Sequence, residues 1–115
     1  MEIGTDIESI SRIKTVLERT PRFKERCFTQ NEIAYCESKG KNSAESYAAR
    51  FSAKEAFSKA IGQPVSWQDV EILNNNEGKP EVFTYNKAKE LVGNRTVKVS
   101  LSHANDMALA FVIIY

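Results

Sequence analysis

The sequence predicts a single α+β domain in which a mostly antiparallel sheet packs against one long and several short helices. Two observations favour this class. Helical periodicity dominates the first half of the chain and strand periodicity the second, without the regular alternation that is typical of a parallel sheet. The chain also has 115 residues, the length of one domain with a modest core, so we expect one domain over residues 1–115.

The first half of the chain opens with a strand and continues with two helices. In residues 2–7, isoleucine or threonine alternates with glycine or an acid, which is typical of a strand. Gly4 leaves bare backbone beside Asp6, where another group can approach closely. Apolar residues at helical spacing then predict a helix over 10–20, which ends at a Thr-Pro pair. The segment TQNE has the form of a capping box and predicts a short helix over residues 29–38.

The longest predicted helix covers residues 43–61 and closes at Gly62. Beyond it we expect a hairpin, a short helix and two further strands joined by a turn. These elements span, in order, residues 70–73 and 81–84, residues 85–92, and residues 96–102 and 107–115 around a turn at 103–106.

The long helix has little polar surface. On a helical wheel, large apolar side chains cover one broad face and alanines cover the opposite face. One chain of this length should not need to bury so much apolar surface, so we expect the helix to require neighbouring copies. Its charged residues Arg50, Lys54, Glu55 and Lys59 need partners. A plain Glu55–Lys59 pair, four residues apart, is the simplest alternative to a functional role.

The composition argues against several classes of function. A net charge of +1 disfavours a nucleic-acid binder, and no apolar run reaches the roughly 18 residues of a membrane helix. The first residues do not resemble an export signal, and Cys27 and Cys36 have no zinc-type spacing, so we expect reduced thiols in a cytoplasmic protein. His103 is the only histidine, which leaves zinc or Ser-His-Asp chemistry almost nothing to build on.

Two acids and one short motif are candidates for chemistry. Asp6 and Glu55 could supply the carboxylate pair of a Mg²⁺ site if the first strand packs beside the long helix. Their spacing does not show that they meet, and each is also typical of an ordinary cap or surface acid. His103, with the hydroxyls of Ser100 and Ser102, could donate to a phosphate or could simply cap the turn.

The segment between Arg12 and Arg26 is locally basic. It carries six basic residues against two acidic ones. This pattern predicts either an ordinary solvated face or a docking surface for an acidic partner.

Three motifs, taken together and in this order, resemble those of the holo-acyl-carrier-protein synthases in the 4'-phosphopantetheinyl transferase superfamily. They are GTDIESI at 4–10, RFSAKEAFSKA at 50–60 and SLSH at 100–103, and the segments 28–32 and 69–80 also fit. The chain departs from the family in a short loop after residue 60 that keeps one glycine, and in an alanine after the SLSH motif. Its length is similar to that of the small class, whose members are homotrimers with active sites at subunit interfaces.

The resemblance implies a reaction and a site. The expected enzyme transfers the 4'-phosphopantetheine arm of coenzyme A to a serine of acyl carrier protein, in fatty acid biosynthesis. By this resemblance Asp6 and Glu55 bind Mg²⁺, Glu55 accepts the serine proton directly or through a metal-bound water, and Lys59 assists the departure of adenosine 3',5'-bisphosphate. The expected nucleotide-binding residues are Arg50, Lys54, Lys59, Gly62, Ser102 and His103. The expected docking residues for the carrier are Arg12, Arg22, Phe23 and Arg26.

Two alternatives stay open at this point. The same chemistry could serve a carrier domain of a polyketide or peptide synthetase. Alternatively, the chain could be a non-catalytic α+β binding module with a degenerate site. The presence of every charged motif residue (Asp6, Glu55, Lys59 and His103) favours the enzyme.

Overall fold

The computed structural model describes all of residues 1–115 and confirms the predicted fold class. Five strands form two antiparallel sheets. The larger sheet has the order β1 (Glu2–Ser9), β5 (Met107–Ile114), β4 (Val97–Ala104), and the smaller one is the hairpin of β2 (Val70–Asn74) and β3 (Pro80–Thr84).

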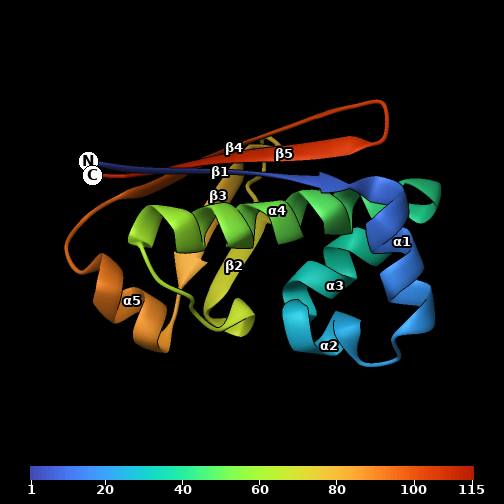
Figure 1. Ribbon diagram of the computed structural model, residues 1–115, viewed down its shortest axis with the longest axis horizontal. Helices are drawn as coiled ribbons and strands as arrows, with labels where there is room; N and C mark the ends of the chain where they lie inside the picture. Colours follow the sequence, from blue (N-terminus) through green and yellow to red (C-terminus); the bar gives the residue numbers. More distant parts are fainter.

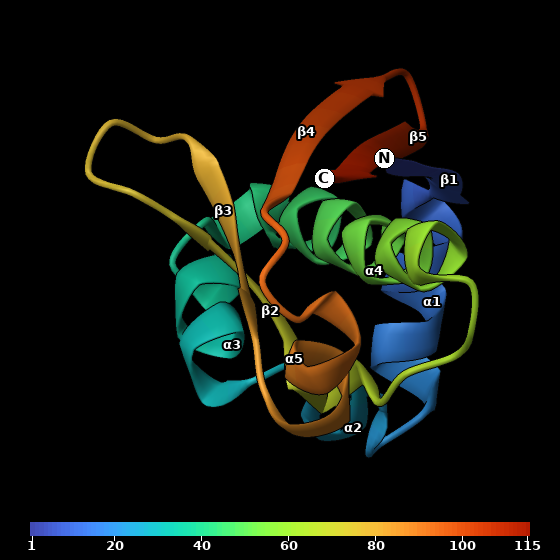
Figure 2. The ribbon, with the colours of Figure 1, turned by 90° about the vertical axis from the view of Figure 1, so that its left-hand side faces the viewer.

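The long helix occupies the centre of the molecule, between the two sheets (Figures 1 and 2). Three helices gather at one end of it and one helix at the other, while both chain termini lie together at one end of the large sheet. The helices are α1 (Ile10–Arg19), α2 (Phe23–Cys27), α3 (Gln30–Glu37), α4 (Ser43–Ile61) and α5 (Asn86–Val92), with short 3₁₀ turns η1 (Gly40–Asn42) and η2 (Trp67–Asp69).

Helix α4 has the bounds that its sequence pattern predicts and ends at Gly62, which takes the left-handed conformation with φ 85°. Ala53, Ala56 and Ala60 are buried on it, and the main core joins α4 to both sheets. The expectation that α4 needs neighbouring copies is therefore wrong. Its apolar circumference is covered within one chain, because a sheet lies on each side of it.

Close packing of α4 on the large sheet explains the glycine of the first motif. A Cβ atom at Gly4 would lie 2.0 Å from the carbonyl oxygen of Ala56 and 2.7 Å from the nitrogen of Ala60. The group that approaches this bare backbone is thus α4 itself. Asp6 lies two residues further along the strand, so it shares the face of β1 that meets α4.

The other face of the large sheet is uncovered and carries large apolar side chains on β1 and β5. The large side chains exposed on it lie on β1 and β5 and are between 38 and 60% exposed: Ile3, Ile7, Met107, Leu109 and Phe111. Strand β1 therefore turns its glycine and acids toward the helix and its isoleucines toward solvent, the reverse of the usual arrangement. An exposed apolar face of this kind marks a surface for association.

Smaller features complete the fold. The capping box of α3 is formed in both directions between Thr29 and Glu32. Helix α2 and turn η2 were not predicted, because each is too short to produce a periodic pattern. Strand β4 extends to Ala104, so His103 lies within a strand and not in the predicted turn. No helix combines the length and apolar character that a bilayer crossing requires.

Candidate active site

Asp6 and Lys59 meet where β1 lies along α4. The Lys59 ammonium lies 3.3 Å from Asp6 Oδ1 and donates to the carbonyl oxygen of Thr5 at 3.0 Å. About two helical turns before Lys59, the Ser52 hydroxyl donates to the carbonyl oxygen of Asp6 at 2.8 Å. The Asp6 side chain is only 12% exposed, whereas that of Lys59 is 59% exposed. A buried acid and an accessible cation thus stand side by side.

Glu55 lies on the same side of α4, one turn before Lys59, and bonds to a different partner. The indole nitrogen of Trp67 donates to Glu55 Oε1 at 3.2 Å. The plain Glu55–Lys59 pair that we considered as an alternative is not formed, because Lys59 bonds to β1 instead. A cavity of about 320 Å³ opens at this point, bordered by Glu55, Lys59, Trp67 and the loop residues Gln63–Val65.

Glu8 is a third acid in this region. It follows Asp6 by two residues on the same face of β1. The pKa of Glu8 is raised to about 7, first by burial and then by the neighbouring carboxylates of Asp6 and Glu55, while Arg12 acts in the opposite sense. The three acids therefore share one region of negative potential.

The donor set fits a hard divalent cation. Asp6 Oδ2 is buried and has no hydrogen-bond partner, which is costly for a carboxylate oxygen unless a cation or another donor meets it. No group of three or more acidic, histidine or cysteine side chains is arranged so that it could hold a metal ion by itself. Two carboxylates completed by water and phosphate oxygens are the ligand set that Mg²⁺ prefers.

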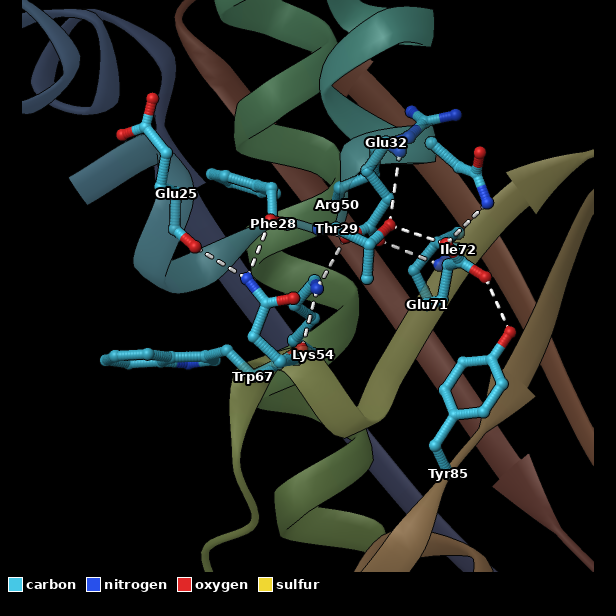
Figure 3. Close-up of polar contacts among 12 residues, drawn as sticks. Glu25, Phe28, Thr29, Glu32, Arg50, Lys54, Trp67, Glu71, Ile72 and Tyr85 are labelled. Atoms are coloured by element: carbon cyan, nitrogen blue, oxygen red, sulfur yellow. Dashed lines mark hydrogen bonds and ion pairs between the residues drawn. The ribbon is translucent and has the colours of Figure 1, made fainter. Parts of the chain in front are cut away.

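Lys54 is not available to a nucleotide, which corrects our expectation. Its side chain is 1% exposed, and the ammonium forms an ion pair of 2.7 Å with Glu32, whose side chain is fully buried. It also donates to the carbonyl oxygen of Trp67 at 2.8 Å (Figure 3). Burial lowers the pKa of Lys54 and the Glu32 carboxylate opposes that change. Lys54 is thus a buried structural cation.

Arg50 projects from α4 on the face opposite Lys59, since nine residues separate the two. It is 3% exposed, stacks 4.2 Å from the ring centre of Tyr35 and donates to Asn74 Oδ1 at 2.6 Å, while its Nε has no partner. It borders a cavity of about 310 Å³ formed with β4 and the β2–β3 turn. This cavity shares no lining residue with the one beside Glu55.

Ser102 and His103 lie on β4, at the far edge of the large sheet from Asp6. His103 occupies the α4 face, in one row with Ala108 and Glu8, and its ring lies 3.3 Å from Glu45. Ser102 is adjacent in sequence and so projects from the outer face. Within one chain, the predicted nucleotide-binding residues on β4 are thus separated from Asp6, Glu55 and Lys59.

The basic segment forms α1, α2 and the loop between them. Arg12, Arg22 and Arg26 are exposed. Phe23 is partly buried instead, because its ring packs against Phe51, with 5.7 Å between ring centres, and against Phe28. Phe23 therefore anchors α2 to the body of the protein.

Sequence reasoning missed three residues of this site. Glu8 was identifiable, because the period of a strand places residues i and i+2 on one face. The Ser52 hydroxyl and the Trp67 indole gave no signal, since their roles depend on how β1 and η2 pack against α4.

Comparisons with known proteins identify the family of this chain. Residues 2–112 match the family described as the 4'-phosphopantetheinyl transferase superfamily. The holo-[acyl-carrier-protein] synthase of Ruminiclostridium cellulolyticum is 46% identical over 99% of this chain and 91% of its own length. The crystal structure of the Bacillus anthracis synthase in complex with CoA (3',5'-ADP) has a TM-score of 0.83 at 36% identity, covering 98% of this chain and 94% of that one. The Helicobacter pylori synthase in complex with coenzyme A has a TM-score of 0.84 at 31% identity, covering 98% of this chain and 99% of that one. Since the family match and these relatives span nearly the whole chain, the protein belongs to the 4'-phosphopantetheinyl transferase superfamily.

Proposed function

We infer that this protein is an enzyme that transfers the 4'-phosphopantetheine moiety of coenzyme A to a serine of apo acyl carrier protein. The inference rests on full-length similarity to holo-acyl-carrier-protein synthases, two of which bind coenzyme A in their crystals. Family membership alone would leave the activity open. The observation that carries it is the cluster of Asp6, Glu55 and Lys59, in which a buried carboxylate oxygen has no partner.

Asp6 and Glu55 are the residues that would hold Mg²⁺. When bound there, the ion would neutralise charge on the pyrophosphate of coenzyme A. The Asp6 carboxylate is well suited because its position is fixed by the packing of Gly4 on α4 and by the Ser52 bond to its carbonyl oxygen.

The protein's own groups then account for the transfer. The serine oxygen attacks the phosphorus atom of the pantetheine phosphate, and the bond from that phosphorus to the bridging oxygen breaks. Glu55 accepts the serine proton directly or through a water, since Trp67 engages only one of its oxygens. The exposed Lys59 ammonium meets the negative charge that develops on the departing adenosine 3',5'-bisphosphate.

We further propose that the complete site is shared between two copies of the chain. Asp6, Glu55 and Lys59 form one half-site beside β1, while Arg50, Ser102 and His103 lie toward β4 and form a second half-site. Gly62, at the end of α4, belongs to the first half-site by position. If the β1 side of one chain met the β4 side of the next, both half-sites would face one coenzyme A.

The uncovered outer face of the large sheet supports a closed homotrimer. Its exposed apolar side chains lie on β1 and β5, between the two half-sites. A head-to-tail contact that uses both edges of this sheet closes into a ring when the rotation fits. Light scattering should give three times the mass of one chain, and the mass of one chain at micromolar concentration would contradict the proposal.

A complementation experiment tests the shared site. Asp6→Asn and His103→Ala variants, each inactive alone, should regain about a quarter of wild-type activity when unfolded and refolded together in equal amounts. This gain is expected because one interface in four then combines two intact half-sites. No gain would mean that each chain holds a complete site.

The function itself is tested by a transfer assay. Purified protein, coenzyme A, Mg²⁺ and apo acyl carrier protein should give a carrier heavier by one phosphopantetheine, and EDTA should prevent the change. Apo carrier domains of a polyketide and of a peptide synthetase serve as competing acceptors. Absence of transfer to every carrier would overturn the proposed function.

A further inference from the structure

Trp67 is the only tryptophan of the chain and lies beside the proposed active site. Its indole N–H donates to Glu55 Oε1 at 3.2 Å. The indole ring packs against Phe51 of α4, with 5.8 Å between ring centres, and borders the cavity next to Glu55. The side chain is 38% exposed and is therefore partly covered by these contacts.

The main chain around Trp67 is held by buried groups. Lys54 donates to the carbonyl oxygen of Trp67 at 2.8 Å, and the same ammonium is paired with Glu32. Glu32 is fixed in turn, because it accepts from the backbone nitrogens of Thr29 and Ile72. Figure 3 shows Lys54 between Glu32 and Trp67 at the centre of this network.

Gln68 ties the same turn to helix α2. Its amide donates to the carbonyl oxygens of Glu25 and Phe28, each at 2.7 Å. The turn η2 is therefore fixed at two points by side chains that do not touch Glu55 themselves. The indole is the group that carries this rigidity to the carboxylate.

We propose that Trp67 is a positioning residue for Glu55, held in place by the buried pair of Lys54 and Glu32. The outer torsion of a glutamate side chain is soft, so a carboxylate on a helix surface samples many orientations. One N–H donor engages one oxygen and leaves the other directed toward the cation or the reacting hydroxyl. This inference rests on the proposed function, because that function gives the Glu55 carboxylate a cation or a hydroxyl to bind.

The first test is Trp67→Phe, which removes the indole N–H and keeps an aromatic ring against Phe51. The Mg²⁺ concentration for half-maximal transfer should rise about 10-fold, since groups that orient metal ligands typically contribute 10- to 100-fold in affinity. The KM for carrier protein should not change. Gln68→Ala is the matched control: it removes one of the two attachments of this turn but keeps the Lys54 bond to Trp67 and the indole N–H, and should change the Mg²⁺ requirement less than about twofold.

The second test needs no variant. The emission of Trp67 in the wild-type protein should shift with added Mg²⁺, and added Mn²⁺ should quench it, over the concentrations that support transfer. Asp6→Asn should abolish both responses. This fluorescence reports a cation bound next to the indole, and it does not depend on whether Trp67→Phe folds well.

The outcomes separate this inference from the proposed function. If the wild type transfers phosphopantetheine but Trp67→Phe has an unchanged Mg²⁺ requirement, the positioning role is wrong and the function stands. The same holds if Gln68→Ala produces an equal change, or if the emission does not respond to either metal. If the wild type shows no Mg²⁺-dependent transfer, both are overturned.

Discussion

Helix α4 carries two lysines, five residues apart, and each is paired with a carboxylate. One pair is buried and the other is accessible to solvent. The Lys54–Glu32 pair is 2.7 Å long, with both side chains at most 1% exposed. The Lys59–Asp6 pair is 3.3 Å long, with Lys59 59% exposed. Both lysines belong to the same sequence motif, yet one is enclosed and the other reaches solvent.

The difference lies in how completely the partners are satisfied. Glu32 accepts from Lys54 and from two backbone nitrogens, so its buried charge is fully compensated. Asp6 keeps one buried oxygen without a donor. A satisfied buried pair specifies the structure, whereas an unsatisfied carboxylate beside an accessible cation is prepared to meet a ligand. The structural pair and the pair proposed for catalysis are thus separated along one helix.

The largest effect should come from the reactive pair. Asp6→Asn keeps the shape of the side chain but removes its charge, and should lower the transfer rate by about four orders of magnitude, equivalent to about 5 kcal/mol. Its free energy of unfolding should stay within about 1 kcal/mol of wild type, because the Asp6 charge is not part of the satisfied core. Single-turnover transfer and urea unfolding measure the two quantities. A variant that keeps a tenth of the activity would contradict the metal assignment.

The enclosed pair should show the reverse pattern. Lys54→Met leaves the Glu32 carboxylate buried without its cation, and should lower the free energy of unfolding by about 3–5 kcal/mol. Lys59→Met, the matched control on the same helix, should cost less than about 1 kcal/mol, because an exposed pair contributes little. Urea unfolding at equal protomer concentration compares them. Equal losses would show that exposure does not separate the two pairs.

The sequence alone predicted helix α4 but not that Lys54 would be buried on it. Periodicity and caps predicted α4 with its observed bounds, since its signals are local. The resemblance assigned Lys54 and Lys59 to the same site, because a motif does not show which face of a helix becomes covered. That depends on the hairpin of β2 and β3 and on η2, whose packing against α4 is set by contacts distant in sequence.

The large sheet shows the same limit. Alternation predicted β1 and its two faces, but not which face would be covered. The usual rule places isoleucines inside, and the observed order is the reverse, because Gly4 and the alanines Ala108 and Ala110 admit α4 more closely than larger side chains would. Asp6 reaches the helix for that reason, and the isoleucines are left exposed to solvent.

A third test asks whether the reactive side of α4 is separate from the basic surface. Arg22→Glu with Arg26→Glu should raise the KM for carrier protein about tenfold and weaken its salt dependence, since exposed charges mainly govern encounter. The KM for coenzyme A should not change. Arg12 is left intact, because its charge also acts on Glu8. Steady-state kinetics at two salt concentrations measures both constants, and a change confined to coenzyme A would mean that the surfaces are reversed.

The smallest effect concerns Glu8, which adds an uncompensated acid to the reactive side. Burial and the adjacent carboxylates raise the pKa of Glu8 from 4.5 to about 7 in the folded protein. Between these values the folded state keeps a proton that the unfolded chain has lost, so stability falls as pH rises through this range and stays lower above it.

Glu8→Gln removes this dependence. Because Glu8 is partly exposed, we expect the variant to gain only about 1 kcal/mol over wild type near pH 8. At pH values below 4.5, where Glu8 is protonated in both states, the difference should vanish. Urea unfolding in EDTA at the two pH values measures it, and an equal difference at both would show that the charge of Glu8 is not the cause.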